Sequence, residues 1–199
     1  MHHYPPTAKG GSADLASALR AGRVYRREDL ARVSNAVDRH LRELVAGGQL
    51  KKLAQGLYYA PRQSPFGAVP PDDHELVKAF LRDKNFLVFS PSAYNTLGLG
   101  TTQLYNRTLV YNHKRHGVFA LGNRQFDCRV KPCFPKKLTP EFLLVDMLNN
   151  LDELAEDKLL VLAEAQSKVV KFDRLHLLRA LANYGSMATK KRMAGWLHG

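Results

Sequence analysis

The sequence predicts an α+β protein in which a small helical domain precedes a larger mixed domain. In the first part, three helix-like segments are followed by two short strand candidates. In the second part, apolar strand-like runs come first and helix-like segments come last, which is the order typical of α+β folds. Two helices, a tight turn, a longer helix and a hairpin form the order of a winged helix-turn-helix. We therefore expect that fold in the first domain.

The domain boundaries follow from size and from Pro and Gly residues. A chain of 199 residues could form one large domain, but a small domain plus a larger one fits the usual size range equally well. Residues 1–11 are polar and rich in Pro and Gly, as expected of a mobile leader, and the Pro-rich residues 63–73 predict a semi-rigid linker. We therefore expect the winged domain at 12–62 and an α+β domain at 74–199.

Capping residues and glycines predict the first two helices. Ser12 is a good N-cap ahead of apolar residues at helical spacing, and Gly22 ends that helix. The dipeptide Val24-Tyr25 is long enough only for a short extended segment. Residues 26–31 then predict a second, short helix.

A third, longer helix is predicted from Ser34 or Asn35, either of which can cap it, to Gly47-Gly48. Its apolar residues recur at i, i+4, i+7 and i+8, which indicates one stripe facing a core. That stripe consists of Val37, Leu41, Leu44 and Val45. Residues 50–53 and 57–60 are strand candidates, and Ala54-Gln55-Gly56 between them predicts the turn of a hairpin.

The second domain begins with strands and ends with helices. After a helix over residues 75–82, strands are predicted at 86–89, 108–111, 118–121 and 125–130, the last two joined as a hairpin by Gly122-Asn123. The next helix is predicted to start at Pro140, since proline suits the first helical position and Thr139 before it can act as the N-cap. Further helices are predicted over 153–167, 172–183 and 186–197.

Charge and cysteine content limit the classes of partner. The 30 Lys and Arg residues against 18 Asp and Glu leave a formal net charge of +12, which favours polyanionic partners such as nucleic acid. The two cysteines, Cys128 and Cys133, cannot supply the four ligands of a structural zinc site, so we expect no metal and no cofactor. The chain lacks a secretion signal and the roughly 18 apolar residues that span a bilayer, so we expect a cytoplasmic protein with no membrane partner.

The early part of the third helix carries residue types suited to reading base pairs. In a helix-turn-helix, the second helix of the pair lies in the major groove with its first residues at base edges. Asn can contact adenine, Arg can contact guanine, and the methyl group of Ala can contact thymine. The expected contacts are Ser34, Asn35, Ala36, Arg39 and Arg42.

Two acids on the same exposed surface oppose this role. Asp38 and Glu43 are unfavourable next to phosphate, and Arg39 and Arg42 could instead pair with them or with Glu28. Both interpretations stay open at this point.

The hairpin offers cations where a wing would contact phosphates or the adjacent minor groove. Lys51 and Lys52 lie at its start, Gln55 lies at its tip and Arg62 follows it. The lysines could equally be edge residues that prevent strand pairing between molecules. Contacts to phosphate and this protective role are both compatible with the sequence.

A second concentration of cations lies between residues 103 and 137, where Asp127 is the only acid. Its cations are Arg107, Lys114, Arg115, Arg124, Arg129 and Lys131, followed by Lys136 and Lys137. The interleaved aromatic residues are Tyr105, Tyr111, His113, His116 and Phe134. Such a pattern can bind single-stranded nucleic acid by stacking and charge, but it also results when aromatics form the core of a sheet and cations its solvated face. An RNA-binding or protein-interaction module over residues 107–137 is therefore the alternative function.

Few features point to catalysis. His113 and His116 have no nearby acid or third histidine at metal spacing, and the P-loop, G-x-S-x-G and H-E-x-x-H motifs are absent. The acids between Asp146 and Asp157 lie on expected helices, where we expect them on a solvated face or near helix N-termini. We expect that the protein is not an enzyme.

Two parts of the chain resemble AbiEi-type antitoxins of bacterial type IV toxin-antitoxin systems. Residues 24–30, 37–44 and 56–59 resemble the N-terminal winged helix of that family. Residues 90–103 resemble the start of its second domain, where a small-residue helix leads into a Gly-Leu-Thr-Thr-Gln turn. This chain departs from the family by an inserted Gly100 and by Leu-Tyr after the turn, where the family often has Val-Pro. Most of residues 12–165 is covered.

The resemblance implies a transcriptional autorepressor whose winged helix binds inverted repeats of double-stranded DNA in the promoter of its own operon. It also implies an antitoxin that counteracts a nucleotidyltransferase-like toxin without forming a stable complex with it. A single winged helix reads only a short site, so high specificity requires two copies on a repeated operator. We therefore expect a second protomer on the DNA.

Overall fold

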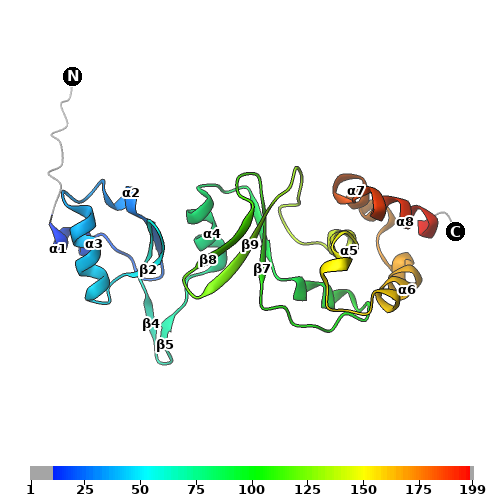
Figure 1. Cartoon of the computed structure of the whole chain (residues 1–199), viewed down its shortest axis with the longest axis horizontal. Coiled ribbons are helices and arrows are strands. Elements are labelled where there is room, and N and C mark those ends of the chain that lie inside the picture. The colour runs from blue at the N-terminus through cyan, green and yellow to red at the C-terminus, as the bar shows by residue number, and fades with distance from the viewer. Residues whose placement is uncertain (1–10, 198–199) are drawn as a thin grey trace, which may run out of the picture. The chain divides into compact units, whose positions relative to one another are not determined.

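The computed structural model of the protein describes residues 11–197, which divide into two compact units (Figure 1). Within that range, the first unit comprises residues 11–84 and 120–124, and the second comprises residues 85–119 and 125–197. Strands occupy the middle of the chain and helices its end, which confirms the α+β class. Apart from Gly11, the expected leader at residues 1–11 lies outside the described residues.

Three helices begin the first unit: α1 (Ser12–Ser17), α2 (Arg27–Leu30) and α3 (Val37–Ala46). They share one core, to which α1 contributes Leu15, α2 contributes Leu30, and α3 contributes Leu41 and Leu44. The apolar stripe of α3 is therefore confirmed, although Val45 is only partly buried.

The first helix differs from its prediction at both ends. Its N-cap is Gly11 instead of Ser12, and the N–H of Gly11 donates to the carboxylate of Asp14 at 2.8 Å. It also ends at Ser17, well before Gly22, which adopts a left-handed turn at φ +84°. A glycine after a helical pattern marks a turn without marking where the helix itself stops.

The three helices accompany a three-stranded antiparallel sheet with the order β1-β3-β2. Its strands are β1 (Val24–Arg26), β2 (Lys51–Ala54) and β3 (Leu57–Tyr59). The expected hairpin is thus confirmed, with Gly56 at φ +70° in its turn. The expected extended segment at Val24-Tyr25 is part of β1, which pairs with β3 at one edge of this sheet.

The prediction of a linker at residues 63–73 is wrong. This segment forms a second hairpin, β4 (Arg62–Ser64) with β5 (Gly67–Val69), and leads into α4 (Asp73–Leu81). The first compact unit therefore continues past residue 62 and includes α4. The helix is held to β1 by the guanidinium of Arg26, which donates to the carbonyl of Ala79 at the C-terminal end of α4.

A four-stranded sheet dominates the first half of the second unit, with the order β6-β7-β9-β8. Its strands are β6 (Phe86–Phe89), β7 (Thr108–Asn112), β8 (Gly117–Leu121) and β9 (Arg124–Val130). All four expected strands are confirmed. The sheet is mixed, because β7 pairs antiparallel with β6 and parallel with β9. The tip of the β8–β9 hairpin belongs to the first unit, where the N–H of Gly122 donates to the carbonyl of Leu53 at 2.7 Å.

Helices complete the second unit. They are the 3₁₀ helix η1 (Pro91–Leu97), α5 (Pro140–Asn149), η2 (Leu151–Glu153), α6 (Lys158–Lys168), η3 (Val169–Lys171), α7 (Arg174–Tyr184) and α8 (Met187–Leu197). The predicted cap of α5 is confirmed, since the hydroxyl of Thr139 accepts from the N–H of Phe142 at 3.2 Å. Every residue from Phe142 to Leu148 is buried, so α5 is the central helix of this core.

Candidate nucleic-acid interface

The chain enters α3 through Asn35, which is exposed, and Ala36, which is the N-cap and is partly buried. Ser34 is buried instead. Its hydroxyl lies 2.8 Å from Nδ1 of His40 and accepts from the N–H of Ala36 at 3.2 Å. The prediction that Ser34 or Asn35 caps α3 is wrong, because the N-cap position is occupied by Ala36. The predicted contact of Ser34 with DNA is wrong as well, because its side chain is buried and its hydroxyl is engaged inside the fold.

Both arginines of α3 lie on its exposed face. The side chain of Arg39 is 66% exposed, with its Nε 3.7 Å from the carboxylate of Glu43. Arg42 donates from Nε to the backbone carbonyl of Asp38 at 3.2 Å. Arg39 thus does pair with an acid of its own helix, as the sequence allowed, and DNA would have to displace Glu43. Exposed ion pairs contribute only about 0–1 kcal/mol, so a phosphate or a base edge can replace Glu43 at little cost.

His40 supports this face from the inside and was not predicted from the sequence. It is buried on the core side of α3, and its Nε2 lies 3.2 Å from a terminal nitrogen of Arg39. Because a guanidinium can only donate, Nε2 accepts and the ring proton lies on Nδ1, from which it is donated to Ser34. The sequence did contain a signal for its burial, since His40 lies three residues after Val37 and therefore on the apolar stripe of α3.

A salt bridge joins α2 to α3. Arg27 contacts Asp38 through two bonds, Nε to Oδ1 at 2.7 Å and Nη2 to Oδ2 at 2.5 Å. The hydrogen bond from Arg27 holds the pKa of Asp38 below its usual value. Asp38, whose negative charge would disfavour an approaching phosphate, is therefore charge-paired within the protein.

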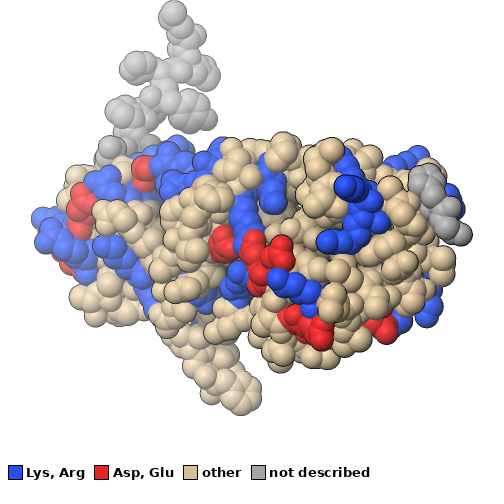
Figure 2. All heavy atoms as spheres, turned by 45° about the vertical axis from the view of Figure 1, so that its right-hand side comes forward, with Lys and Arg blue, Asp and Glu red and all other residues tan. Residues whose placement is uncertain are grey.

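The first hairpin displays its polar residues as expected. Lys51 and Lys52 are exposed and lie opposite Tyr59 and Tyr58, so they point to the two faces of the sheet. Gln55 is exposed at the turn. Among residues 11–197, no hydrogen bond or ion pair occupies the ammonium group of either lysine. Figure 2 shows that Lys and Arg side chains are exposed on both units.

Lys51 lies close to the base of the second hairpin. It lines a cavity of about 240 Å³ together with Tyr59, Val69 and Pro70. The hydroxyl of Tyr59 donates to the carbonyl of Val69 at 2.7 Å, which ties the two hairpins together. Arg62 is exposed at the start of β4, opposite Val69.

Three arginines of the second basic segment pair with carboxylates, two of which lie outside that segment in the sequence. Arg129, whose side chain is only 14% exposed, contacts Asp127 at 2.8 Å and Glu153 at 2.5 Å. Arg107 lies 3.5 Å from Glu153, and Arg124 pairs with Asp73. Burial lowers the pKa of Arg129, but its hydrogen bonds to Glu153 and Asp127 outweigh burial and raise it. These three arginines are ordered parts of the fold, which the prediction of an open basic surface did not anticipate.

Two of the remaining cations of that segment lie near aromatic rings. Lys131 lies 5.1 Å from the ring centre of Tyr111, and Arg115 lies 5.9 Å from that of Phe119. Tyr111 is buried in the core. His113 stacks on Phe134, with ring centres 4.7 Å apart. The exposed Lys114 adjoins this stack in the sequence. For Tyr111 this arrangement supports the interpretation that the aromatics form the core, whereas the exposed His113 keeps its stack with Phe134 near the surface.

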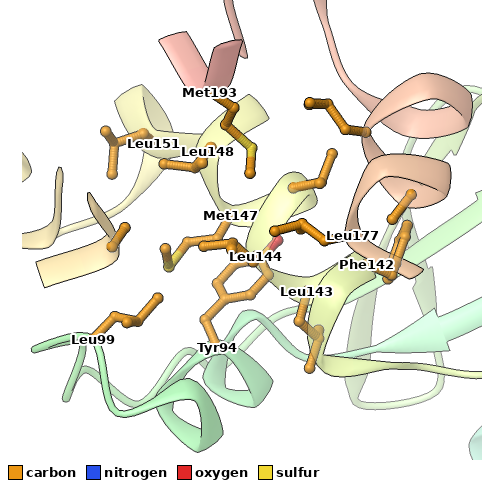
Figure 3. Packing of buried hydrophobic residues seen from close by; sticks show 14 of the residues in the cluster. Tyr94, Leu99, Phe142, Leu143, Leu144, Met147, Leu148, Leu151, Leu177 and Met193 are labelled. Atoms are coloured by element: carbon orange, nitrogen blue, oxygen red, sulfur yellow. The ribbon is translucent and has the colours of Figure 1, made fainter. Parts of the chain in front are cut away.

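One of the acids expected on a solvated helix face is buried. Asp146 lies inside α5 and accepts from the hydroxyl of Tyr94 at 2.7 Å and from that of Tyr111 at 2.9 Å. Figure 3 shows Tyr94 within the core beside Leu144. Asp157 does approach a helix N-terminus, since its carboxylate accepts from two N–H groups at the start of α6. Asp146, Tyr94 and Tyr111 thus form a buried hydrogen-bonded cluster that stabilises the core.

Residues 11–197 contain no group of three or more His, Cys, Asp or Glu side chains that could hold a metal ion. Cys128 is buried, Cys133 is exposed, and both are free thiols. Within the same range, no helix has the length and apolar character needed to cross a membrane.

Comparisons with known proteins establish fold similarity alone. No family model matches the chain, and no curated protein matches it. Among solved structures, it is similar to the RV2827C protein from Mycobacterium tuberculosis, with a TM-score of 0.58 and 20% sequence identity. The similarity covers 94% of this chain and 74% of that one.

Proposed function

We propose that the protein binds double-stranded DNA in a sequence-specific manner through a winged helix-turn-helix in its first unit. The observation that carries the proposal is the exposed face of α3, which presents Arg39 and Arg42 in the same compact unit as a hairpin whose lysines have no partner in the described chain. In this proposal α2 and α3 form the helix-turn-helix, and β2 with β3 forms the wing.

The contacts divide into reading and anchoring. Asn35 and Arg39 lie at the start of α3, where side chains of a recognition helix meet base edges. Lys51 and Lys52 anchor the protein on phosphates, with no sequence preference of their own. Ser34 acts indirectly, because it fixes the entry into α3 through His40.

We further propose that this DNA binding represses the protein's own operon and that the protein is the antitoxin of a type IV system. The resemblance to AbiEi-type antitoxins supports this part. The partner would be a nucleotidyltransferase-like toxin, opposed without a stable complex and without catalysis or a cofactor. Co-expression with the product of the neighbouring reading frame tests it: rescue of growth supports the proposal, and continued toxicity contradicts it.

RNA binding by residues 107–137 receives less support. Arg107, Arg124 and Arg129 are already paired with carboxylates, which leaves a smaller set of cations for an RNA backbone.

Gel retardation tests the DNA-binding proposal. The full chain is titrated, at moderate salt, against short duplexes tiled across the DNA upstream of its reading frame and against a shuffled duplex. We expect one tile to bind preferentially. Arg39→Ala should weaken binding to that tile by about 1–3 kcal/mol, whereas Lys52→Ala should weaken binding to all duplexes and lower the salt slope by about 1.

Lys158→Ala is the matched control. It removes the same charge from the second unit, where Lys158 pairs with Asp152 at 2.7 Å, and should leave the titrations unchanged. Absence of a retarded band with every tile would contradict DNA binding. Equal losses for Arg39→Ala on specific and shuffled DNA would remove base reading from Arg39.

A further inference from the structure

The second hairpin, β4–β5, displays a phenylalanine that packs against none of the other residues that the structure describes. The side chain of Phe66, at its tip, is 100% exposed. Figure 1 shows the hairpin extending away from the rest of the first unit. A large apolar side chain held fully in water gains nothing for folding, because the hydrophobic effect acts only when apolar surface is buried.

The turn holds Phe66 in a defined position. The hydroxyl of Ser64 donates to the carbonyl of Gly67 at 2.8 Å and accepts from the N–H of Phe66 at 3.3 Å. Pro65 has a restricted φ, and Gly67 adopts φ +104°, which only glycine accepts without strain. Ser, Pro and Gly at the first, second and fourth positions are the residues that a type I turn favours. The exposure of Phe66 is therefore specified by the turn.

The charge of the hairpin suits a polyanion. Residues 61–71 contain no acid, and Arg62 lies on the first strand. The base of the hairpin lies against Lys51, which we assign to phosphate contact, since Lys51 and Val69 line the same cavity. The hairpin thus continues the surface on which the wing would meet DNA.

We propose that this hairpin is a second DNA-binding element, in which Phe66 inserts between base pairs from the minor groove; the inference rests on the proposed DNA binding. Proteins that read the minor groove use apolar wedges, Phe among them, to unstack a base step. The groove is about 6 Å wide, which admits the narrow tip of a two-residue turn more readily than a helix. Arg62 lies beside the groove and contacts phosphate.

The apolar surface of the hairpin is small for a protein partner. A stable protein interface buries about 800 Å² on each side, whereas the exposed apolar groups here are Phe66 with Pro65 and Ala68 at its flanks. A single base step needs only one wedge. The hairpin therefore fits DNA better than it fits a second copy of the chain.

Site-specific 2-aminopurine fluorescence tests the wedge. The tile bound in gel retardation is synthesised with 2-aminopurine at successive positions, and the full chain is added at saturation. We expect fluorescence to rise at one base step, where stacking is lost. Phe66→Ala should abolish the rise and weaken binding about 5- to 100-fold, as expected for loss of one stacked base contact. Phe66→Trp should retain both.

A control variant separates the wedge from general effects of apolar side chains. Leu104 is 86% exposed in the second unit, and Leu104→Ala should change neither fluorescence nor affinity. Because Phe66 contacts no core, Phe66→Ala should keep the thermal midpoint of the wild type.

Three results would overturn the inference. Tight binding with no change at any 2-aminopurine position would exclude the wedge while DNA binding stands. A wild-type dimer that Phe66→Ala converts to a monomer in sedimentation would assign the hairpin to a second copy. Absence of binding to every duplex would remove both the wedge and the proposed function.

Discussion

We expect Asp146→Ala to lower the free energy of unfolding by about 2–6 kcal/mol. The structure places Tyr94 and Tyr111 as donors to the Asp146 carboxylate, and both hydroxyls are buried. Removing the carboxylate leaves two buried hydroxyl groups without their acceptor, at about 1–3 kcal/mol each. Asn150 donates to the oxygen of Tyr111 at 3.3 Å and cannot take over the lost role, because its amide nitrogen is not an acceptor.

Asp146→Asn is the matched control, because it keeps the shape and one acceptor oxygen and adds a donor for a tyrosine oxygen. We expect a change of about 1 kcal/mol or less. Urea unfolding followed by far-ultraviolet circular dichroism measures both variants. A loss below about 1 kcal/mol for Asp146→Ala would refute the argument that this carboxylate satisfies the two hydroxyls.

We also expect the stability difference between the wild type and Asp146→Asn to depend on pH. Burial raises the pKa of Asp146, while the hydrogen bonds from Tyr94 and Tyr111 act in the opposite direction. The folded state therefore binds this proton more tightly than the unfolded state, whose Asp pKa is about 3.9. The contribution of Asp146 to stability is largest below about pH 4 and falls as pH rises through the raised folded value. The stability of Asp146→Asn relative to wild type should accordingly increase from acid to neutral pH. A difference that is constant with pH would refute the raised pKa.

Two further sets of substitutions test local packing by the same unfolding assay. Ser34→Ala should cost about 1–3 kcal/mol, because it leaves the buried Nδ1 of His40 without its partner; no loss would contradict the hydrogen bond between Ser34 and His40. Gly185→Ala should cost about 1–3 kcal/mol, because its Cβ would lie 2.6 Å from the carbonyl oxygen of Leu181 and must displace the end of α7. Gly195→Ala, in α8 and facing open space, should instead raise stability by up to about 1 kcal/mol, and equal effects of the two glycines would contradict the steric explanation.

Local signals predicted the secondary structure well where they are chemically specific. Thr139 followed by Pro140 marked the start of α5, and Gly56 marked the turn between β2 and β3. The order of strands in the larger sheet was not predicted, because the parallel pairing of β7 with β9 joins residues that no local pattern connects. The second hairpin was missed because its prolines indicated a linker, although Ser64 and Gly67 flank a two-residue turn.

In the candidate site too, features set by local sequence were predictable, whereas contacts between residues distant in the sequence were not. Exposure of Asn35, Arg39 and the lysines of β2 follows from helix and strand periodicity, which is a local property. The ion pair of Arg129 with Glu153 spans 24 residues, so no motif could indicate it. The burial of Ser34 likewise depends on its contact with His40, which lies six residues later within α3.

The structure also identifies which residues support the proposed DNA-binding surface without contacting DNA themselves. Arg27 pairs with Asp38 across α2 and α3, and Ser34 holds His40 beneath Arg39. All three contacts lie within the protein, so the exposed face of α3 that we propose for DNA binding is held in place without DNA. Pre-organisation of this kind lowers the ordering cost of binding. A chain with the same reading residues but without these supports would present Arg39 less well, and its affinity would fall although every proposed base contact was retained.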